Sequence, residues 1–211
     1  ILDKDVFIMK SVFPIKIDFQ KSSGSFVHDK NTDVKYLDLF SMYSSLALGY
    51  NHPIFDEGYN EIISRISHLR TCNNLFESDE LLEFLAEFKP YAFSENIHFT
   101  CTGALAVESA IKSAMEYKKV KNPMVLSLSD SFHGISSWGF LTDRFHPISD
   151  RLRYVPDNNW KNLKFEEVEK YFSEQDLSNL VAFVLEPIRC TVGDKYVPHQ
   201  QIRRIQQLCH D

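Results

Sequence analysis

The sequence predicts an α/β fold, because strand-like and helix-like stretches alternate along its second half. From Asn96 onward, a short apolar stretch is followed by an amphipathic one three times. Such alternation is typical of a parallel sheet covered by helices. A single glycine, Gly103, stands in the turn between the first of these strands and its helix. Ligands of parallel sheets bind beyond the carboxyl ends of the strands, so the turns there are the first candidates for a functional site.

The first half of the chain predicts short strands and then two helices. Polar and apolar positions alternate over residues 1–40, with strands expected at 15–19, 24–29 and 35–40 and a polar turn at 29–33. Helices are expected at 54–69, where apolar residues recur at helical spacing, and at 78–88, where Ser78 is placed as a cap.

The second half predicts three strand–helix pairs. The strands are expected at 97–100, 125–128 and 181–185, and the helices at 103–119, 165–172 and 199–210. The helix at 103–119 carries Ala, Val, Ile and Met on the side expected to face a core.

Composition narrows the class of protein. The 211 residues are 44% hydrophobic, which indicates a globular chain, and the net charge of −6 without a long basic run argues against nucleic acid as a partner. No apolar run reaches the roughly 18 residues of a membrane span. The cysteines are widely separated, which argues against a metal site or a disulfide framework and predicts small buried thiols in a cytoplasmic protein: Cys72, Cys101, Cys190 and Cys209.

Three turns carry the candidate chemistry. Thr102, Gly103 and Ala104 open a helix whose first N–H groups and positive dipole end would bind a phosphate or another anion. Phe132 and His133 lie in a polar turn that follows the strand at 125–128. Glu186 ends the apolar strand at 181–185, where a carboxylate needs a polar partner or a ligand.

In chain order, four segments resemble the class III aminotransferases: residues 36–53, residues 100–112, the Ser-Phe-His-Gly turn at 131–134 and the Glu-Pro-Ile segment at 186–188. The resemblance covers nearly the whole chain, and its segment at 101–112 is closest to the branch holding lysine 6-aminotransferase and 4-aminobutyrate aminotransferase. It implies a fold-type I pyridoxal-phosphate enzyme with a mainly parallel sheet and helices on both faces, incomplete in this chain. Residues 1–50 would contribute to a small domain, and residues 51–211 would form the first part of the large cofactor-binding domain.

The resemblance also implies roles for single residues. Thr102, Gly103 and Ala104 would hold the phosphate of pyridoxal phosphate, and Phe132 would stack on its ring. His133 would contact the cofactor or bond the local backbone. Glu186 would order groups around the pyridine, or else cap a neighbouring loop. Tyr43 and Arg189 are candidates for binding the substrate, and the alternative for Arg189 is a surface or interface residue.

The family's remaining catalytic parts lie beyond the end of this chain. The aspartate that pairs with the pyridine nitrogen and the Schiff-base lysine both follow the helix at 199–210 in the family, so the chain alone is expected to be inactive. Two positions depart from the family pattern. Ile135 stands where relatives have a carboxylate-binding arginine, and Thr191 stands where they have a glutamate.

Three functions follow from these observations. The first is transamination from an amine or amino acid to a 2-oxo acid by a cytoplasmic homodimer, of which this chain is the front half. The second is a non-catalytic relative that keeps the fold as a binding or structural module, which Ile135 and Thr191 favour. The third is an unrelated α/β phosphate-binding protein, which would explain only the glycine turn.

Overall fold

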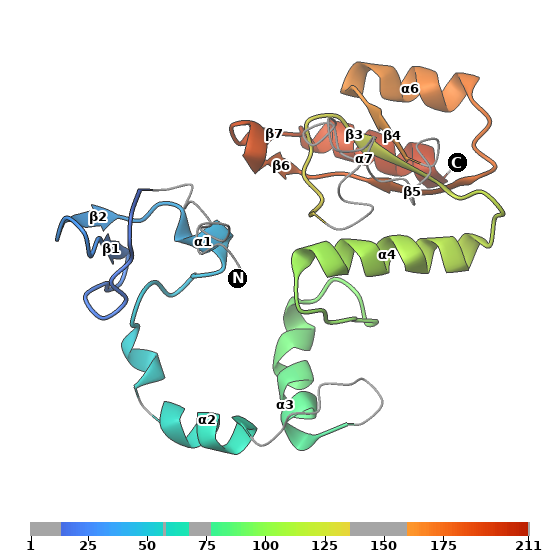
Figure 1. The fold of residues 1–211 in the computed structure, drawn as a ribbon. Coiled ribbons are helices and arrows are strands. Elements are labelled where there is room, and N and C mark those ends of the chain that lie inside the picture. The colour runs from blue at the N-terminus through green and yellow to red at the C-terminus, as the bar shows by residue number, and fades with distance from the viewer. Residues whose placement is uncertain (1–13, 57, 68–76, 136–159, 211) are drawn as a thin grey trace, which may run out of the picture. The chain divides into compact units, whose positions relative to one another are not determined.

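The computed structural model describes residues 14–56, 58–67, 77–135 and 160–210, and the chain divides into two compact units, residues 1–86 and 87–211 (Figure 1). Each unit is described by itself. The predicted division at residue 50, between parts of two domains of a larger enzyme, stays a prediction.

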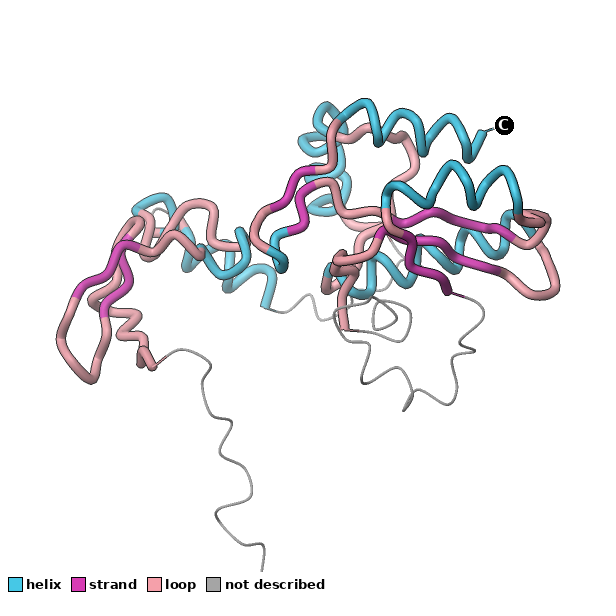
Figure 2. The backbone as a smooth tube through the Cα atoms, turned by 90° about the horizontal axis from the view of Figure 1, so that it is seen from above, coloured by secondary structure: helices cyan, strands magenta, loops and turns pink. Residues whose placement is uncertain are grey.

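The second unit is built on a parallel sheet of three strands in the order β4-β3-β5. The central strand, β3 (Met124–Leu128), pairs in parallel with β4 (Trp160–Leu163) on one side and with β5 (Leu180–Val184) on the other. A β-hairpin of β6 (Ile188–Arg189) and β7 (Lys195–Tyr196) stands apart from this sheet (Figure 2). The parallel sheet predicted from the sequence is therefore confirmed.

Helices cover both faces of this sheet, as expected (Figure 1). Helix α4 (Gly103–Lys118) packs through Ile111 against Val125 and Val181 on one face. On the other face, α6 (Phe165–Glu174) and α7 (His199–His210) pack through Val168 and Ile205 against Leu126 and Leu128. Successive residues of a strand point to opposite faces, so β3 supplies both cores and is buried along nearly its whole length.

The first unit holds the short antiparallel pair β1 (Phe26–His28) and β2 (Lys35–Leu37). Asp29 stabilises the connecting turn, because its Oδ1 accepts a hydrogen bond from the N–H of Lys16 at 2.9 Å and its Oδ2 accepts one from the hydroxyl of Thr32 at 2.6 Å. These hydrogen bonds to the charged form lower the pKa of Asp29. The first unit also holds the helices α1 (Ser41–Ser44) and α2 (Tyr59–Ser67) and the 3₁₀ turn η1 (Pro53–Phe55). Helix α3 (Asp79–Phe88) crosses from the first unit into the second, which holds the 3₁₀ turns η2 (Lys89–Tyr91) and η6 (Cys190–Val192).

Two predicted strands are wrong. Residues 97–100 have no regular secondary structure, and residues 15–19 form only an isolated bridge between Ile17 and Asp29. A strand requires a second strand to complete its ladder. Among the described residues, 97–100 have no such partner and 15–19 pair only at Ile17. The predicted helix at 54–69 is shortened at its start, because Gly58 adopts a φ of +69° between η1 and α2. Its last two positions lie outside the described residues.

The sequence did not predict β4. Its four residues, Trp-Lys-Asn-Leu, include a lysine and an asparagine and have little strand character. It is a strand because β3 lies beside it, with Val125 opposite Trp160 and Leu128 opposite Leu163.

The predicted burial of the cysteines is wrong for the three that the structure describes. Cys101, Cys190 and Cys209 are free and exposed, because they lie in the turn before α4, at the start of η6 and in the last turn of α7. Cys72 lies outside the described residues. No helix in the described parts of the chain is long and apolar enough to cross a membrane.

Candidate functional site

The turn predicted to bind an anion is the first turn of α4. Thr102 is the N-cap, in extended backbone conformation, and its Oγ1 accepts a hydrogen bond from the N–H of Leu105 at 3.2 Å. The first N–H groups of a helix have no partner within the helix, and Gly103 is exposed. Leu105 uses the Thr102 hydroxyl only as an acceptor, and no described residue accepts the hydrogen of that hydroxyl.

The space over Gly103 is open. A β-carbon built on Gly103 would meet no atom of the described chain within 4 Å, so a side chain there would not strike the turn itself. That it would strike a bound phosphate stays a prediction. The glycine that the packing requires is Gly134, which has a φ of +102° and faces Ala104. A β-carbon on Gly134 would lie 2.8 Å from the Cα of Ala104. The structure thus brings the turn at 131–134 against the start of α4.

Glu186 ties this turn to the segment after β5. Its Oε2 accepts a hydrogen bond from the N–H of Phe132 at 2.9 Å, and its Oε1 accepts one from the N–H of Cys190 at 3.3 Å. Glu186 therefore has the polar partners that its position demanded, and it holds two loops at the carboxyl edge of the sheet. The expected loop cap is present in this geometry, and cofactor contact by Glu186 stays a prediction.

His133 is directed into the protein. Its side chain is buried, and its ring centroid lies 6.2 Å from that of Trp160. Burial lowers the pKa of His133 to about 4, so the ring is neutral near pH 7. Its Nε2 is buried and has no hydrogen-bond partner among the described residues. We therefore expect His133 to hold the turn at 131–134 in place by packing against Trp160.

Trp160 belongs to a buried polar cluster beside His133. Its Nε1 donates to the Oγ of Ser127 and to the Oδ1 of Asn162, both at 3.0 Å, and the Ser127 hydroxyl also donates to Asn162. The sequence did not predict this cluster. Its signal was a serine within the apolar strand at 125–128, where a buried hydroxyl needs a partner.

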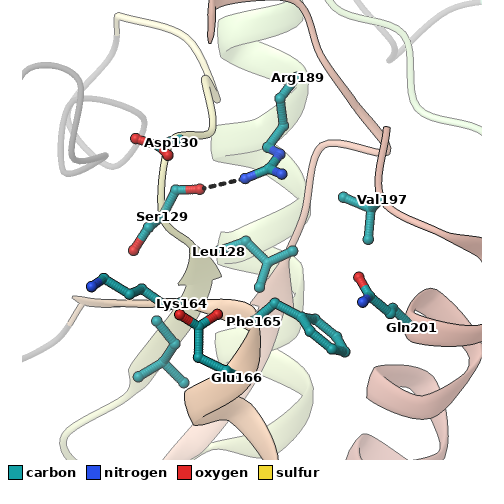
Figure 3. Close-up of a pocket in the computed structure, with 10 residues that line it drawn as sticks. Leu128, Ser129, Asp130, Lys164, Phe165, Glu166, Arg189, Val197 and Gln201 are labelled. Atoms are coloured by element: carbon teal, nitrogen blue, oxygen red, sulfur yellow. Dashed lines mark hydrogen bonds between the residues drawn. The ribbon is translucent and has the colours of Figure 1, made fainter. Parts of the chain in front are cut away.

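The side chain of Arg189 contacts the segment just after β3. Its Nη1 donates to the backbone carbonyl of Ser129 at 3.3 Å, and its buried Nε has no hydrogen-bond partner among the described residues. The side chain borders a cavity of about 330 Å³ at the ends of β3 and β4, on the sheet face that α6 and α7 cover (Figure 3). The cavity is lined by Leu128, Ser129, Asp130, Leu163, Lys164, Phe165, Glu166, Arg189, Val197 and Gln201.

Tyr43 belongs to the first unit and is 84% exposed. It lies in α1, where four consecutive residues that are not glycine, Ser41 to Ser44, have φ between +48° and +63°. This is left-handed backbone, which costs roughly 1–2 kcal/mol per residue for L-amino acids. The turn was not predicted, since the sequence of Ser41–Ser44 contains no glycine.

The geometry agrees with the family found by comparison. Residues 7–211 match the family model described as aminotransferase class-III. The acetylornithine aminotransferase of Synechocystis sp. is 24% identical over 220 residues, covering 98% of this chain and 49% of that protein. The L-lysine-epsilon aminotransferase of Streptomyces clavuligerus is 25% identical over 233 residues, covering 94% of this chain and 51% of that protein.

Solved structures show the same fold. The lysine aminotransferase from M. tuberculosis in the internal aldimine form superposes with a TM-score of 0.81 at 22% identity, covering 97% of this chain and 54% of that one. The chain spans about half the length of the curated relatives it matches.

Proposed function

Because this chain belongs to the class III aminotransferase family, we propose that it is part of a pyridoxal-phosphate-dependent aminotransferase that moves an amino group from an amine or amino acid to a 2-oxo acid. The observation that carries this proposal is the junction at Ala104, where the turn of Phe132, His133 and Gly134 meets the open N-terminus of α4. The matched relatives are themselves named as aminotransferases.

The residues at this junction fit pyridoxal phosphate. The N–H groups of Gly103 and Ala104 would hold the phosphate, and the hydroxyl of Thr102 would donate to it. The open space over Gly103 leaves room for the group. The ring of Phe132 would stack on the pyridine. The bound cofactor supplies the electron sink that transamination needs.

Glu186 and His133 would hold the turn that carries Phe132 in place. Glu186 fixes the backbone N–H of Phe132 at 2.9 Å, and the neutral ring of His133 packs beside Trp160. Both would act mainly by holding the turn in place. This support matters because a stacking ring contributes only when its position is fixed before the ligand binds.

Tyr43 and Arg189 are the proposed contacts for the donor. Ile135 is 66% exposed at the end of the turn and offers no cation for a carboxylate. Arg189 is a cation beside a cavity, and its Nε has no hydrogen-bond partner in the part of the chain that the structure describes. We therefore expect a donor that lacks a carboxylate at the Ile135 end, or one whose carboxylate is bound by Arg189. Because Ile135 and Thr191 differ from the family pattern, a non-catalytic binding protein remains the second candidate function.

The proposed enzyme is a cytoplasmic homodimer. Apolar side chains on α2 and α3 are exposed, including Ile62, Ile66 and Phe84, and neither helix buries a residue in this chain. Such exposed apolar faces are typical of surfaces that another chain or segment covers. The free thiols of the described cysteines agree with a reducing compartment.

The test uses the intact protein that contains this chain and, as a control, the 211-residue chain alone. We expect the intact protein to carry a visible absorbance band after dialysis against pyridoxal phosphate, and the short chain to carry none. A panel of amino donors with 2-oxoglutarate or pyruvate then measures turnover. An intact protein without the band would contradict the proposal, and a band without turnover of any donor would favour the non-catalytic candidate.

A further inference from the structure

The left-handed turn at Ser41–Ser44 is held by one carboxylate, that of Asp38. Its Oδ1 accepts hydrogen bonds from the N–H of Phe40 at 2.8 Å and from the N–H of Ser41 at 2.9 Å. These bonds to the charged form contribute to the lowered pKa of Asp38. Two adjacent N–H groups therefore converge on a single oxygen immediately before the left-handed residues begin.

The other oxygen anchors the turn to the core of the first unit. Asp38 Oδ2 accepts a hydrogen bond from the hydroxyl of Tyr50 at 2.8 Å, and the side chain of Tyr50 is 6% exposed. Burial and the hydrogen bond with Asp38 raise the pKa of Tyr50 to about 12. The phenol thus stays protonated and keeps donating to Asp38 throughout the physiological range.

This arrangement determines where Tyr43 lies. The Tyr43 N–H donates to the carbonyl of Phe40 at 3.2 Å, and the two rings pack edge to face with centroids 4.4 Å apart. The turn is closed again at its far end by Ser45, whose hydroxyl donates to the carbonyl of Met42 at 2.6 Å. An exposed aromatic ring on strained backbone needs such support, because left-handed backbone relaxes unless its surroundings hold it.

From these contacts we infer that Asp38 is a positioning residue for donor recognition, acting through Phe40 and Tyr43. The inference rests on the proposed function, in which Tyr43 contacts the donor. It assigns Asp38 no contact with donor or cofactor. Substitution of Asp38 should therefore raise the Michaelis constant of the donor and leave the visible absorbance of the bound cofactor unchanged.

The experiment compares variants of the intact protein in donor kinetics. Tyr43→Ala and Asp38→Ala should each raise the donor KM about tenfold with kcat nearly unchanged, and the double variant should raise it no further, because both changes remove one interaction. Asp38→Asn keeps an oxygen for the N–H groups of Phe40 and Ser41, so it should restore most of the affinity. Glu61→Ala, at an exposed acid of α2, is the matched control.

A second readout does not depend on catalysis. In the 211-residue chain, hydrogen exchange at the N–H groups of Phe40 and Ser41 should become at least tenfold faster in Asp38→Ala and stay nearly unchanged in Glu61→Ala. If Asp38→Ala does not fold, Tyr50→Phe replaces it, since it frees only one end of the carboxylate and should raise KM about threefold.

The outcomes separate the two proposals. An intact protein that fails to transaminate any donor refutes the proposed function. An active protein in which Asp38→Ala leaves KM unchanged, or in which the effects of Asp38→Ala and Tyr43→Ala multiply, refutes the positioning role and leaves the proposed function standing.

Discussion

Gly134 lies directly against Ala104, so that a β-carbon on Gly134 would stand 2.8 Å from both the Cα and the Cβ of Ala104. Through this contact, the turn that follows β3 and the first turn of α4 form a single surface. The contact joins residues that are far apart in sequence, and it brings the turn that contains Phe132 to the start of α4.

Gly134→Ala should destabilise the 211-residue chain by about 1–3 kcal/mol, because the new methyl group overlaps Ala104 and the φ of +102° disfavours any side chain. Urea denaturation followed by circular dichroism measures the change. Gly103→Ala is the matched control, since that position is open, and it should change the free energy of unfolding by less than about 0.5 kcal/mol. Equal effects of the two substitutions would show that the contact with Ala104 is not made in solution.

Gly103→Val tests the phosphate site. No atom of the described chain lies within 4 Å of a β-carbon at Gly103, so the variant should fold with nearly the parent stability. In the intact protein, the branched side chain should obstruct the approach of a phosphate to the first N–H groups of α4 and weaken pyridoxal-phosphate binding by at least tenfold. Equilibrium titration of cofactor absorbance measures the affinity. An unchanged affinity in the folded variant would remove Gly103 from the site.

Glu186→Gln should loosen the turn of Phe132. A glutamine has one acceptor oxygen for the two N–H groups that the carboxylate now serves, and the lost charge weakens the remaining bond. We expect a loss of about 1–2 kcal/mol in the free energy of unfolding, with faster hydrogen exchange at the N–H groups of Phe132 and Cys190. Glu174→Gln, at the exposed end of α6, is the control. If hydrogen exchange at the N–H groups of Phe132 and Cys190 stayed slow in Glu186→Gln, Glu186 would not be what holds these two loops.

His133 should make stability depend on pH. Burial lowers its pKa from 6.5 to about 4 in the folded chain, so between these values the unfolded chain binds a proton that the folded chain does not. The free energy of unfolding should therefore fall as the pH falls from 6.5 to 4, by about 3 kcal/mol in all.

The measurement compares urea denaturation at pH 7 and pH 4.5 for the parent and for His133→Phe. The variant lacks the titrating ring and should lose about 2–3 kcal/mol less than the parent over this range. His199→Gln, at an exposed histidine that begins α7, should behave as the parent does. Parallel pH dependence in the parent and in His133→Phe would show that His133 is not buried in its neutral form.

The sequence by itself determined the elements that depend on local pattern. Helices α4, α6 and α7 and strands β3 and β5 lie close to their predicted positions, because caps, helical spacing and continuous apolar runs act within one segment. The order of the motifs likewise predicted the family, and Thr102 caps α4 as expected.

Only the tertiary structure decided which segments pair and which polar groups meet. Residues 97–100 have the apolar pattern of a strand but no partner among the described residues, whereas the polar Trp-Lys-Asn-Leu segment is a strand because β3 lies beside it. The same holds for Glu186 with Phe132, for Gly134 with Ala104 and for Asp38 with Tyr50. Strand pairing, close packing and side-chain hydrogen bonds each need atoms from distant parts of the chain. A local sequence pattern does not determine where those atoms lie.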